Sequence, residues 1–476
     1  MSELRQVRPK TEGWKQKLDE SGKPLLMFAE PKRGKPPVHL VDLTAEERAA
    51  KLKEAGIPAF RAKQLANHYF THYTSDPAQM TDLPAAGRDE LVASLLPPLL
   101  TEVKRLQTDN GDTIKFLWRL FDGALVESVL MRYTGRITLC ISSQAGCGMN
   151  CPFCATGQAG LTRNMSAGEI VDQIVRANQV IAAGELGGSK AKMQGAPERV
   201  TNIVFMGMGE PLANYNRLMQ AIRTMLAPQP EGLGMSARNI TVSTVGLVPS
   251  IYKLADEDLP LTFALSLHAP DDELRNEMIP VNSRWNVDEA LDAARAYFEK
   301  TGRRVSIEYA LIKDMNDHAW RADLLAEKLN ARGKGWVHVN PIPLNPTPGS
   351  VWTASLPETT RVWISKLEAA GSVVGCCAGR AARAAAASAS SAALSVAAFS
   401  SCLILASCRV RSPLRSTARP AGDMAPPSTA PPTKLSKYSF LAFSSVRLSP
   451  ACMRSNTCCA ASVRPSAPIV LPVLAK

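Results

Sequence analysis

The chain of 476 residues carries 55 Lys and Arg against 43 Asp and Glu, a formal net charge of +12. Most of the excess lies in residues 371–476, which hold 12 basic residues and a single acid, Asp423. Residues 1–370 hold 43 basic and 42 acidic residues and are close to neutral. The overall charge therefore says little about partners, and any claim of RNA binding must rest on local features.

Residues 1–40 are polar and predict an arm, and residues 41–100 have a helical pattern that predicts a small accessory domain. Thr44 followed by Glu47 is typical of a helix N-terminus. Basic residues alternate with aromatic ones further along: Arg61, Lys63, His68, Tyr69, Phe70, His72 and Tyr73. This pattern fits either an RNA-contacting surface or a solvated helix face around an aromatic core.

Residues 101–135 predict two or three short strands around a turn at 109–112, which would form a β connector. Glu127 lies within an apolar run of this segment. Such an acid either points away from the core or is partly desolvated with a raised pKa. Pattern alone favours the outward orientation.

Residues 136–370 alternate between strand and helix patterns. Ser166 and Glu169 predict a capping box for the first long helix. We expect six strands, near 137–142, 202–206, 239–243, 261–266, 305–311 and 336–341. Six βα units predict an α/β fold, a parallel barrel that is not fully closed, with its chemistry at the carboxyl ends of the strands.

The most specific motif is Cys147-Gly148-Met149-Asn150-Cys151-Pro152-Phe153-Cys154, directly after the first of these strands. Thiolates with this spacing could bind three irons of a [4Fe-4S] cluster and leave the fourth iron open for chemistry. The alternative is a zinc knuckle that takes Cys140 as fourth ligand. Cys140, Cys147, Cys151 and Cys154 are the only cysteines before residue 371, which is typical of a reducing, cytoplasmic location.

Polar or Gly-rich signatures follow four of the other five expected strands. Each is weak alone, but their position at the same barrel end makes them a candidate site. They are Gly207-Met208-Gly209-Glu210-Pro211, Ser243-Thr244-Val245-Gly246, Ser266-Leu267-His268-Ala269 and Asn340 to Pro346.

Together with the cysteine run, these motifs resemble the RlmN/Cfr family of radical S-adenosylmethionine (SAM) adenine methyltransferases, over about residues 40–370. The resemblance implies a partial (βα)6 radical SAM barrel with a small N-terminal helical domain of RNA-binding type and a C-terminal tail foreign to the family. It implies one [4Fe-4S] cluster and SAM as cofactors, and methylation of adenine C2 in 23S rRNA and tRNA. It further implies an electron donor such as flavodoxin, a monomer and no membrane association. Methylation at C8, as in Cfr, is the alternative.

The resemblance also implies roles for individual residues. Cys147, Cys151 and Cys154 match the cluster ligands, and Glu127 and Cys140 match the proton acceptor and the resolving cysteine, which forms a transient disulfide. The positions matching SAM contacts are Gly209, Glu210, Ser243, Ser266, Leu267, His268 and Asn345.

The sequence departs from the family at a second cysteine, which carries the transferred methyl group. The family spacing from Asn345 leads to Ser388 in a run of Ala and Ser, and Cys376 and Cys377 lie too early. We therefore expect this chain to bind the cluster and SAM without completing methyl transfer. A catalytically inactive iron–sulfur protein that binds RNA is an alternative.

The tail, residues 371–476, is rich in Ala, Ser, Pro and Arg. Its uncharged stretch 384–407 is long enough for a membrane span, but it is mostly Ala and Ser. A disordered extension is one interpretation. We favour translation in the wrong frame or strand, because the acidic residues disappear abruptly.

Overall fold

The computed structural model describes residues 18–20, 22, 25–28, 34–345 and 350–374, which lie in one of two compact units of the chain, Met1–Val410. The predictions for Cys376, Cys377 and Ser388, and for nearly all of the tail, fall outside the described residues.

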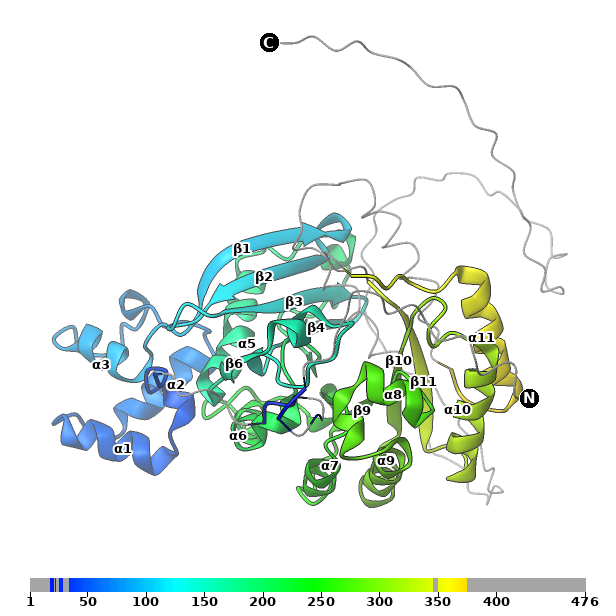
Figure 1. Ribbon diagram of the computed structural model, residues 1–476. Coiled ribbons are helices and arrows are strands. Elements are labelled where there is room, and N and C mark those ends of the chain that lie inside the picture. Colours follow the sequence, from blue (N-terminus) through cyan, green and yellow to red (C-terminus); the bar gives the residue numbers. More distant parts are fainter. Residues whose placement is uncertain (1–17, 21, 23–24, 29–33, 346–349, 375–476) are drawn as a thin grey trace, which may run out of the picture. The chain divides into compact units, whose positions relative to one another are not determined.

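A sheet of nine strands forms the centre of the described body (Figure 1). The strands follow the order β1-β2-β3-β4-β7-β8-β9-β10-β11, and every neighbouring pair from β4 to β11 is parallel. The six parallel strands match the six predicted ones to within two residues at each end, so the partial (βα)6 barrel is confirmed. They are β4 (Arg136–Cys140), β7 (Asn202–Phe205), β8 (Ile240–Thr244), β9 (Thr262–Ser266), β10 (Val305–Leu311) and β11 (Val337–Pro343).

The three strands before the barrel continue the same sheet instead of forming a separate connector. They are β1 (Thr101–Thr108), β2 (Thr113–Arg119) and β3 (Leu125–Tyr133), and they pair antiparallel in sequence order. β3 pairs antiparallel with β4, with Val129 opposite Cys140. This pairing brings residues of β3 next to the first barrel strand.

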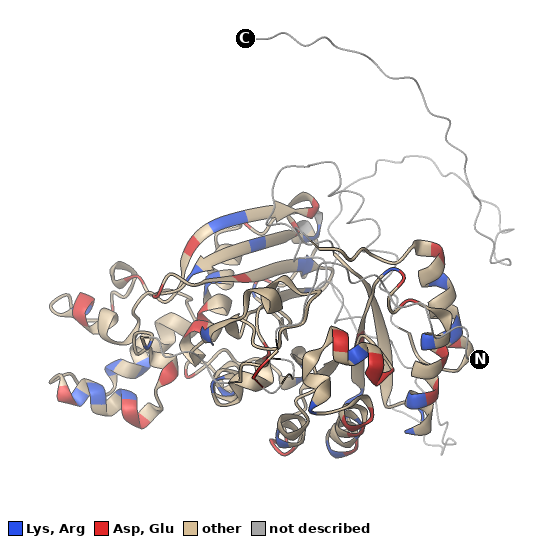
Figure 2. Ribbon diagram, in the orientation of Figure 1, with Lys and Arg blue, Asp and Glu red and all other residues tan. Residues whose placement is uncertain are grey.

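The helices of the barrel connect successive parallel strands and cover one face of the sheet (Figure 1). The first begins with the predicted capping box, in which Ser166 Oγ accepts from the backbone N–H of Glu169. The helices after the cysteine run are α5 (Ala167–Ala182), α6 (Tyr215–Leu226), α7 (Val248–Ala255), α8 (Asp272–Met278), α9 (Val287–Thr301), α10 (Ala319–Ala331) and α11 (Pro357–Ala369). Acidic and basic residues are interspersed on α1, α10 and α11, as expected for a nearly neutral body (Figure 2).

The N-terminal helices are α1 (Ala45–Glu54), α2 (Arg61–Phe70) and α3 (Arg88–Leu95). Tyr69 and Phe70 of α2 are fully buried and belong to the same apolar core as the barrel. The Tyr69 hydroxyl donates to Asp172 Oδ1 of α5 at 3.0 Å. These two aromatic rings therefore serve the core, and RNA contact by the basic residues of α2 stays a prediction.

The body continues past residue 370, where we expected the family-like pattern to end. Val339 of β11 donates its backbone N–H to Val373 at 2.9 Å and forms a parallel bridge with Val374. Residues 373–374 therefore pair with β11 through this hydrogen bond and bridge. In the described part of the chain, no helix is both long and apolar enough to cross a bilayer.

Candidate functional site

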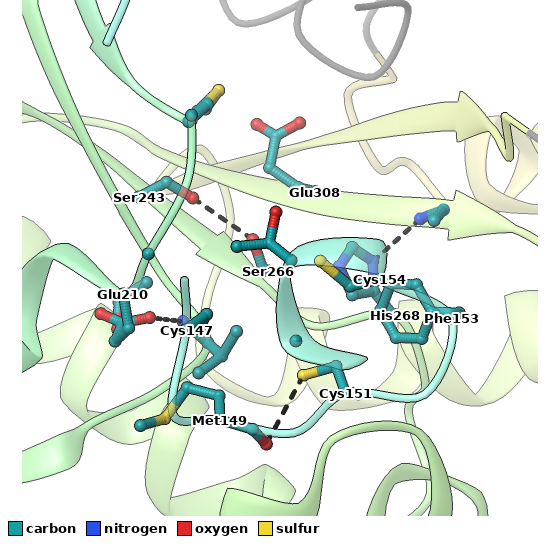
Figure 3. Close-up of a pocket in the computed structure, with 18 of the residues that line it drawn as sticks. Cys147, Met149, Cys151, Phe153, Cys154, Glu210, Ser243, Ser266, His268 and Glu308 are labelled. Carbon is teal, nitrogen blue, oxygen red and sulfur yellow. Dashed lines mark hydrogen bonds between the residues drawn. The ribbon is translucent and has the colours of Figure 1, made fainter. Parts of the chain in front are cut away.

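The carboxyl ends of the parallel strands surround a cavity of about 230 Å³ (Figure 3). The structure brings together nine residues that the sequence placed in the site. They are Cys147, Cys151, Cys154, Gly209, Glu210, Ser243, Ser266, His268 and Asn345. These residues come from strand ends and loops up to 198 positions apart in the sequence, so the barrel itself assembles the site.

The cysteine run is held by a small hairpin that sequence analysis did not predict. β5 (Gln144–Gly146) and β6 (Leu161–Asn164) pair antiparallel on either side of the run, and a short helix, α4 (Ala155–Ala159), follows Cys154. The Cys147 backbone N–H donates to Gly160 O at 2.9 Å and closes the loop. Strands of three and four residues without alternation leave little sequence signal.

The three thiols suit a cluster better than a single ion. Burial is the largest cause of the raised pKa of each thiol, and repulsion from neighbouring cysteines raises the pKa of Cys147 and Cys151 further. Binding to a metal relieves this cost because the thiolate sulfur then bonds the metal and the proton is released to solvent. Among the described residues, no three His, Cys, Asp or Glu side chains converge closely enough to hold one ion. Thiols spread around a cavity instead match ligands of different irons.

Cys140 does not line this cavity. It lines a separate, smaller cavity, so the structure does not bring it to the other three cysteines as a fourth ligand. All four described cysteines are free, so the transient disulfide implied by the resemblance is not formed in this structure.

Glu210 is a buried carboxylate of the site, with 3% of its surface exposed. Its Oε1 accepts from the backbone N–H of Leu212 and its Oε2 from that of Val245, both at 3.0 Å. Burial raises the pKa of Glu210 to about 7, although these hydrogen bonds oppose the shift. Gly209 has φ +102°, and a Cβ there would lie 2.5 Å from Gln144 Cβ, so only glycine fits.

His268 is held as a neutral imidazole at the end of β9. Its Nδ1 accepts from the backbone N–H of Ala310 at 2.9 Å, which leaves Nε2 as the protonated nitrogen. Burial and then the charge of Arg275 lower the pKa of His268 to about 3. The ring packs edge-on against Phe153 of the cysteine run, with centroids 5.3 Å apart (Figure 3). His268 can therefore orient a ligand through hydrogen bonds. Because the ring is neutral, it cannot act as a general acid in the way a protonated imidazolium does.

Ser243 and Ser266 lie beside each other on β8 and β9, with their hydroxyl oxygens 3.2 Å apart. Leu267 is the predicted site residue that does not line the cavity. Its side chain is fully buried in the apolar core. Any contact of Leu267 with a ligand would have to come from its backbone.

Arg275 of α8 is a site-supporting residue that the sequence analysis missed. The side chain is fully buried and donates to the carbonyls of Leu267, Val245 and Ser266, so it ties together the ends of β8 and β9. Burial lowers the pKa of Arg275 to about 10, and the nearby Cys151 thiolate opposes this shift. A lone Arg in a helix pattern gives no sequence signal for such a role.

Glu127 and Cys140 line a second, smaller cavity of about 30 Å³. Glu127 does not take the outward orientation that its pattern favoured, because its face of β3 also carries Val129 and Met131, which pack with Cys140 and Val204 in a second apolar cluster. Lys115 Nζ of β2 lies 2.8 Å from Glu127 Oε2 and holds the carboxylate in place. Met206 and Gly207 line both cavities, so the two candidate sites share a wall.

Comparison with known proteins shows relatives over most of the chain. The profile of the Radical SAM superfamily matches residues 189–325. A probable dual-specificity RNA methyltransferase RlmN of Kocuria rhizophila is 63% identical over 346 residues, which cover 73% of this chain and 90% of the relative. A protein of the same name from Kineococcus radiotolerans is 61% identical over 354 residues, covering 74% and 89%. The crystal structure of a radical SAM methyltransferase from Sphaerobacter thermophilus is 41% identical with a TM-score of 0.65, and the match covers 73% of this chain and 98% of that chain.

Proposed function

The chain belongs to the RlmN family of radical SAM RNA methyltransferases, and we propose that it acts on C2 of adenine in 23S rRNA and in tRNA. The single observation that carries the proposal is the cavity shared by Cys147, Cys151, Cys154 and the Gly209-Glu210 pair. The names of the relatives favour this reaction over methylation at C8.

The three cysteine thiolates would hold a [4Fe-4S] cluster, which when bound supplies reductive cleavage of SAM to a radical at a site closed to water. The Glu210 carboxylate and the Gly209 backbone would bind the SAM ammonium group. Ser243, Ser266, His268 and Asn345 would orient the nucleoside and the carboxylate of SAM. The hydroxyl groups and the neutral imidazole suit these polar but uncharged contacts.

Glu127 and Cys140 would act on the adenine from the wall that their small cavity shares with the larger one. Glu127 would accept the proton that leaves C2, and Lys115 would keep the carboxylate oriented toward that position. The Cys140 thiolate would then attack the sulfur of the methyl-bearing cysteine. An S–S bond would form as the bond from that sulfur to the base-linked carbon breaks, and this carbon would take up a proton to become the methyl group of the product. Desolvation of the buried Cys140 thiol raises its pKa, and the negative charge of Glu127 raises it further. The sulfur is therefore protonated at rest and must lose its proton before it can attack.

The partners follow from this chemistry. We propose 23S rRNA and tRNA as substrates and a flavodoxin-type protein as electron donor. A monomeric state and a reducing, cytoplasmic location stay predictions from the sequence.

The proposed methyl transfer needs a methyl-bearing cysteine, and the sequence has none at the position expected for it. Ser388 occupies the expected position, so we expect SAM to be bound and cleaved while methyl transfer to RNA fails. The test is mass spectrometry of the anaerobically reconstituted chain after incubation with SAM and a one-electron donor such as reduced flavodoxin. No S-methylated cysteine, together with release of 5′-deoxyadenosine, is the expected result, whereas a methyl group on Cys376 or Cys377 would contradict it.

The alternatives give different products. A chain that methylates RNA at C8 would yield 8-methyladenosine in a nucleoside digest instead of 2-methyladenosine. An inactive RNA-binding protein would retain the cluster and bind RNA but release no 5′-deoxyadenosine.

A further inference from the structure

Glu308 is a buried acid in the wall of the cysteine-lined cavity to which neither the motifs nor the relatives' names give a role. It lies on β10, every residue of which is buried, and only 4% of its own surface is exposed. The strand register places Glu308 directly opposite Ser266 of β9 on one side and Asn340 of β11 on the other. Figure 3 shows it beside the Ser243 and Ser266 pair.

The Glu308 carboxylate accepts fewer hydrogen bonds than its two oxygens could. Ser306 Oγ donates to Oε1 at 2.6 Å, and Asn340 Nδ2 donates to Oε2 at 2.7 Å. A carboxylate offers about four acceptor positions, so each oxygen can take one more donor. The amide oxygen of Asn340 is also buried and has no hydrogen-bond partner among the described residues.

No basic side chain in the described part of the chain forms an ion pair with Glu308. Burial raises the pKa of the carboxyl group, which its two hydrogen bonds only partly oppose. A buried acid that accepts hydrogen bonds but has no cation is costly unless a ligand supplies donors. The Glu308 carboxylate and the Ser266 hydroxyl therefore lie next to each other as hydrogen-bond acceptors in one wall of the cavity.

The ligand that fits these two acceptors carries neighbouring hydroxyl groups. A ribose offers two O–H donors on adjacent carbons, and a carboxylate at the end of a parallel strand is a known way to bind them. We propose that Glu308 is a cofactor-binding residue that accepts hydrogen bonds from the ribose hydroxyls of SAM, beside Ser266. The proposal rests on the function proposed above. The competing role is purely structural, in which Glu308 only connects β10 to β11 through Asn340.

The test compares two ligands on the reconstituted full chain by equilibrium dialysis under anaerobic conditions. The ligands are SAM and its 2′,3′-dideoxy analogue, and the proteins are wild type, Glu308→Gln, Glu308→Ala and the surface control Glu358→Gln. Wild type should bind SAM about 10-fold more tightly than the analogue, because hydrogen bonds to a charged group are lost with the hydroxyls.

Glu308→Ala should weaken SAM binding by about 10-fold and leave the Kd of the analogue within about twofold. Glu308→Gln retains an acceptor for Asn340 and should give an intermediate loss, and Glu358→Gln should change neither Kd. If Glu308→Ala does not fold, as judged by circular dichroism, the ratio of the two Kd values in Glu308→Gln decides.

An equal loss of affinity for SAM and for the analogue would overturn the assignment of Glu308. So would a ratio of the two Kd values that stays at the wild-type value in both Glu308 variants. Either result would leave the proposed function intact. Failure of wild type to bind SAM at all would overturn both.

Discussion

Met27 donates its backbone N–H to the carbonyl of Gly148, 2.9 Å away, in the middle of the cysteine run. A Cβ on residue 148 would overlap the Met27 carbonyl, so the glycine is what allows residues 25–28 to lie against the loop. Phe28 anchors this segment. Its ring meets Trp285 edge-on at 6.5 Å and lies 4.9 Å below the guanidinium of Arg284. A part of the chain that we predicted as a polar arm thus packs against the cysteine loop.

Removal of the Phe28 ring should expose the cysteine loop. Loss of an aromatic contact and a cation–π contact costs on the order of 1–2 kcal/mol, which would increase the undocked fraction of the segment several-fold. We expect Phe28→Ala to lose the 410 nm absorbance of the reconstituted protein in air several times faster than wild type. Leu18→Ala, at a position 56% exposed, is the matched control. Equal rates in all three proteins would show that the segment does not protect the loop.

The three cysteines of the run should be individually required for iron, and Cys140 should not. Cys151→Ala removes a thiol that is buried and lines the cavity, whereas Cys140→Ala removes one from the adjacent cavity. Iron and sulfide analysis after anaerobic reconstitution should give near-complete loss for Cys151→Ala and wild-type content for Cys140→Ala. Loss of metal in Cys140→Ala, or zinc in place of iron, would contradict the assignment.

Gly146→Ala should destabilise the hairpin that holds the run. Gly146 has φ +78°, and an added Cβ would overlap the carbonyl of Gly160, which already accepts from Cys147. Gly184→Ala is a matched control, because it has φ +73° but nothing within 4 Å of the added carbon. The control should cost about 1 kcal/mol from backbone strain alone, and Gly146→Ala clearly more. Thermal melts and iron retention would test this, and equal effects of the two substitutions would contradict it.

Sequence analysis predicted the parts of this fold that depend on local pattern. Strands such as β10 carry large apolar residues at alternate positions between turn signals, and polar motifs follow the carboxyl ends of most of them. The cysteine spacing and the Ser166 capping box are likewise local. These features need no knowledge of which strand neighbours which.

The missed features depend on register and packing. Glu308 lines the cavity, where the strand register sets it opposite Ser266 of β9, and Arg275 reaches three carbonyls that only the folded barrel brings together. The outward orientation expected for Glu127 was wrong because a pattern cannot show that this face of β3 packs against a second apolar cluster. Each of these residues acts through neighbours that are distant in sequence.

Acidification should weaken the link between the N-terminal helices and the barrel through His39. This side chain is 1% exposed, its Nδ1 accepts from Val41, and its ring packs against Tyr69 with centroids 4.9 Å apart. Burial, followed by the charges of Arg48 and Arg176, lowers the pKa of His39 from 6.5 to about 3. Asp42 is the nearby acid, and it accepts from the His39 backbone at 3.4 Å.

The folded-state pKa of His39 lies below the unfolded value, so the unfolded chain takes up the proton first as the pH falls. The contribution of neutral His39 is fully present above pH 6.5 and is lost progressively toward pH 3. Between pH 7.5 and 5.5 this loss should be about 1 kcal/mol. Denaturant unfolding at both pH values should show a smaller pH effect in His39→Gln than in wild type. His72→Gln, at an exposed position, should behave as wild type, and an equal pH effect in His39→Gln would assign the acid sensitivity to other groups.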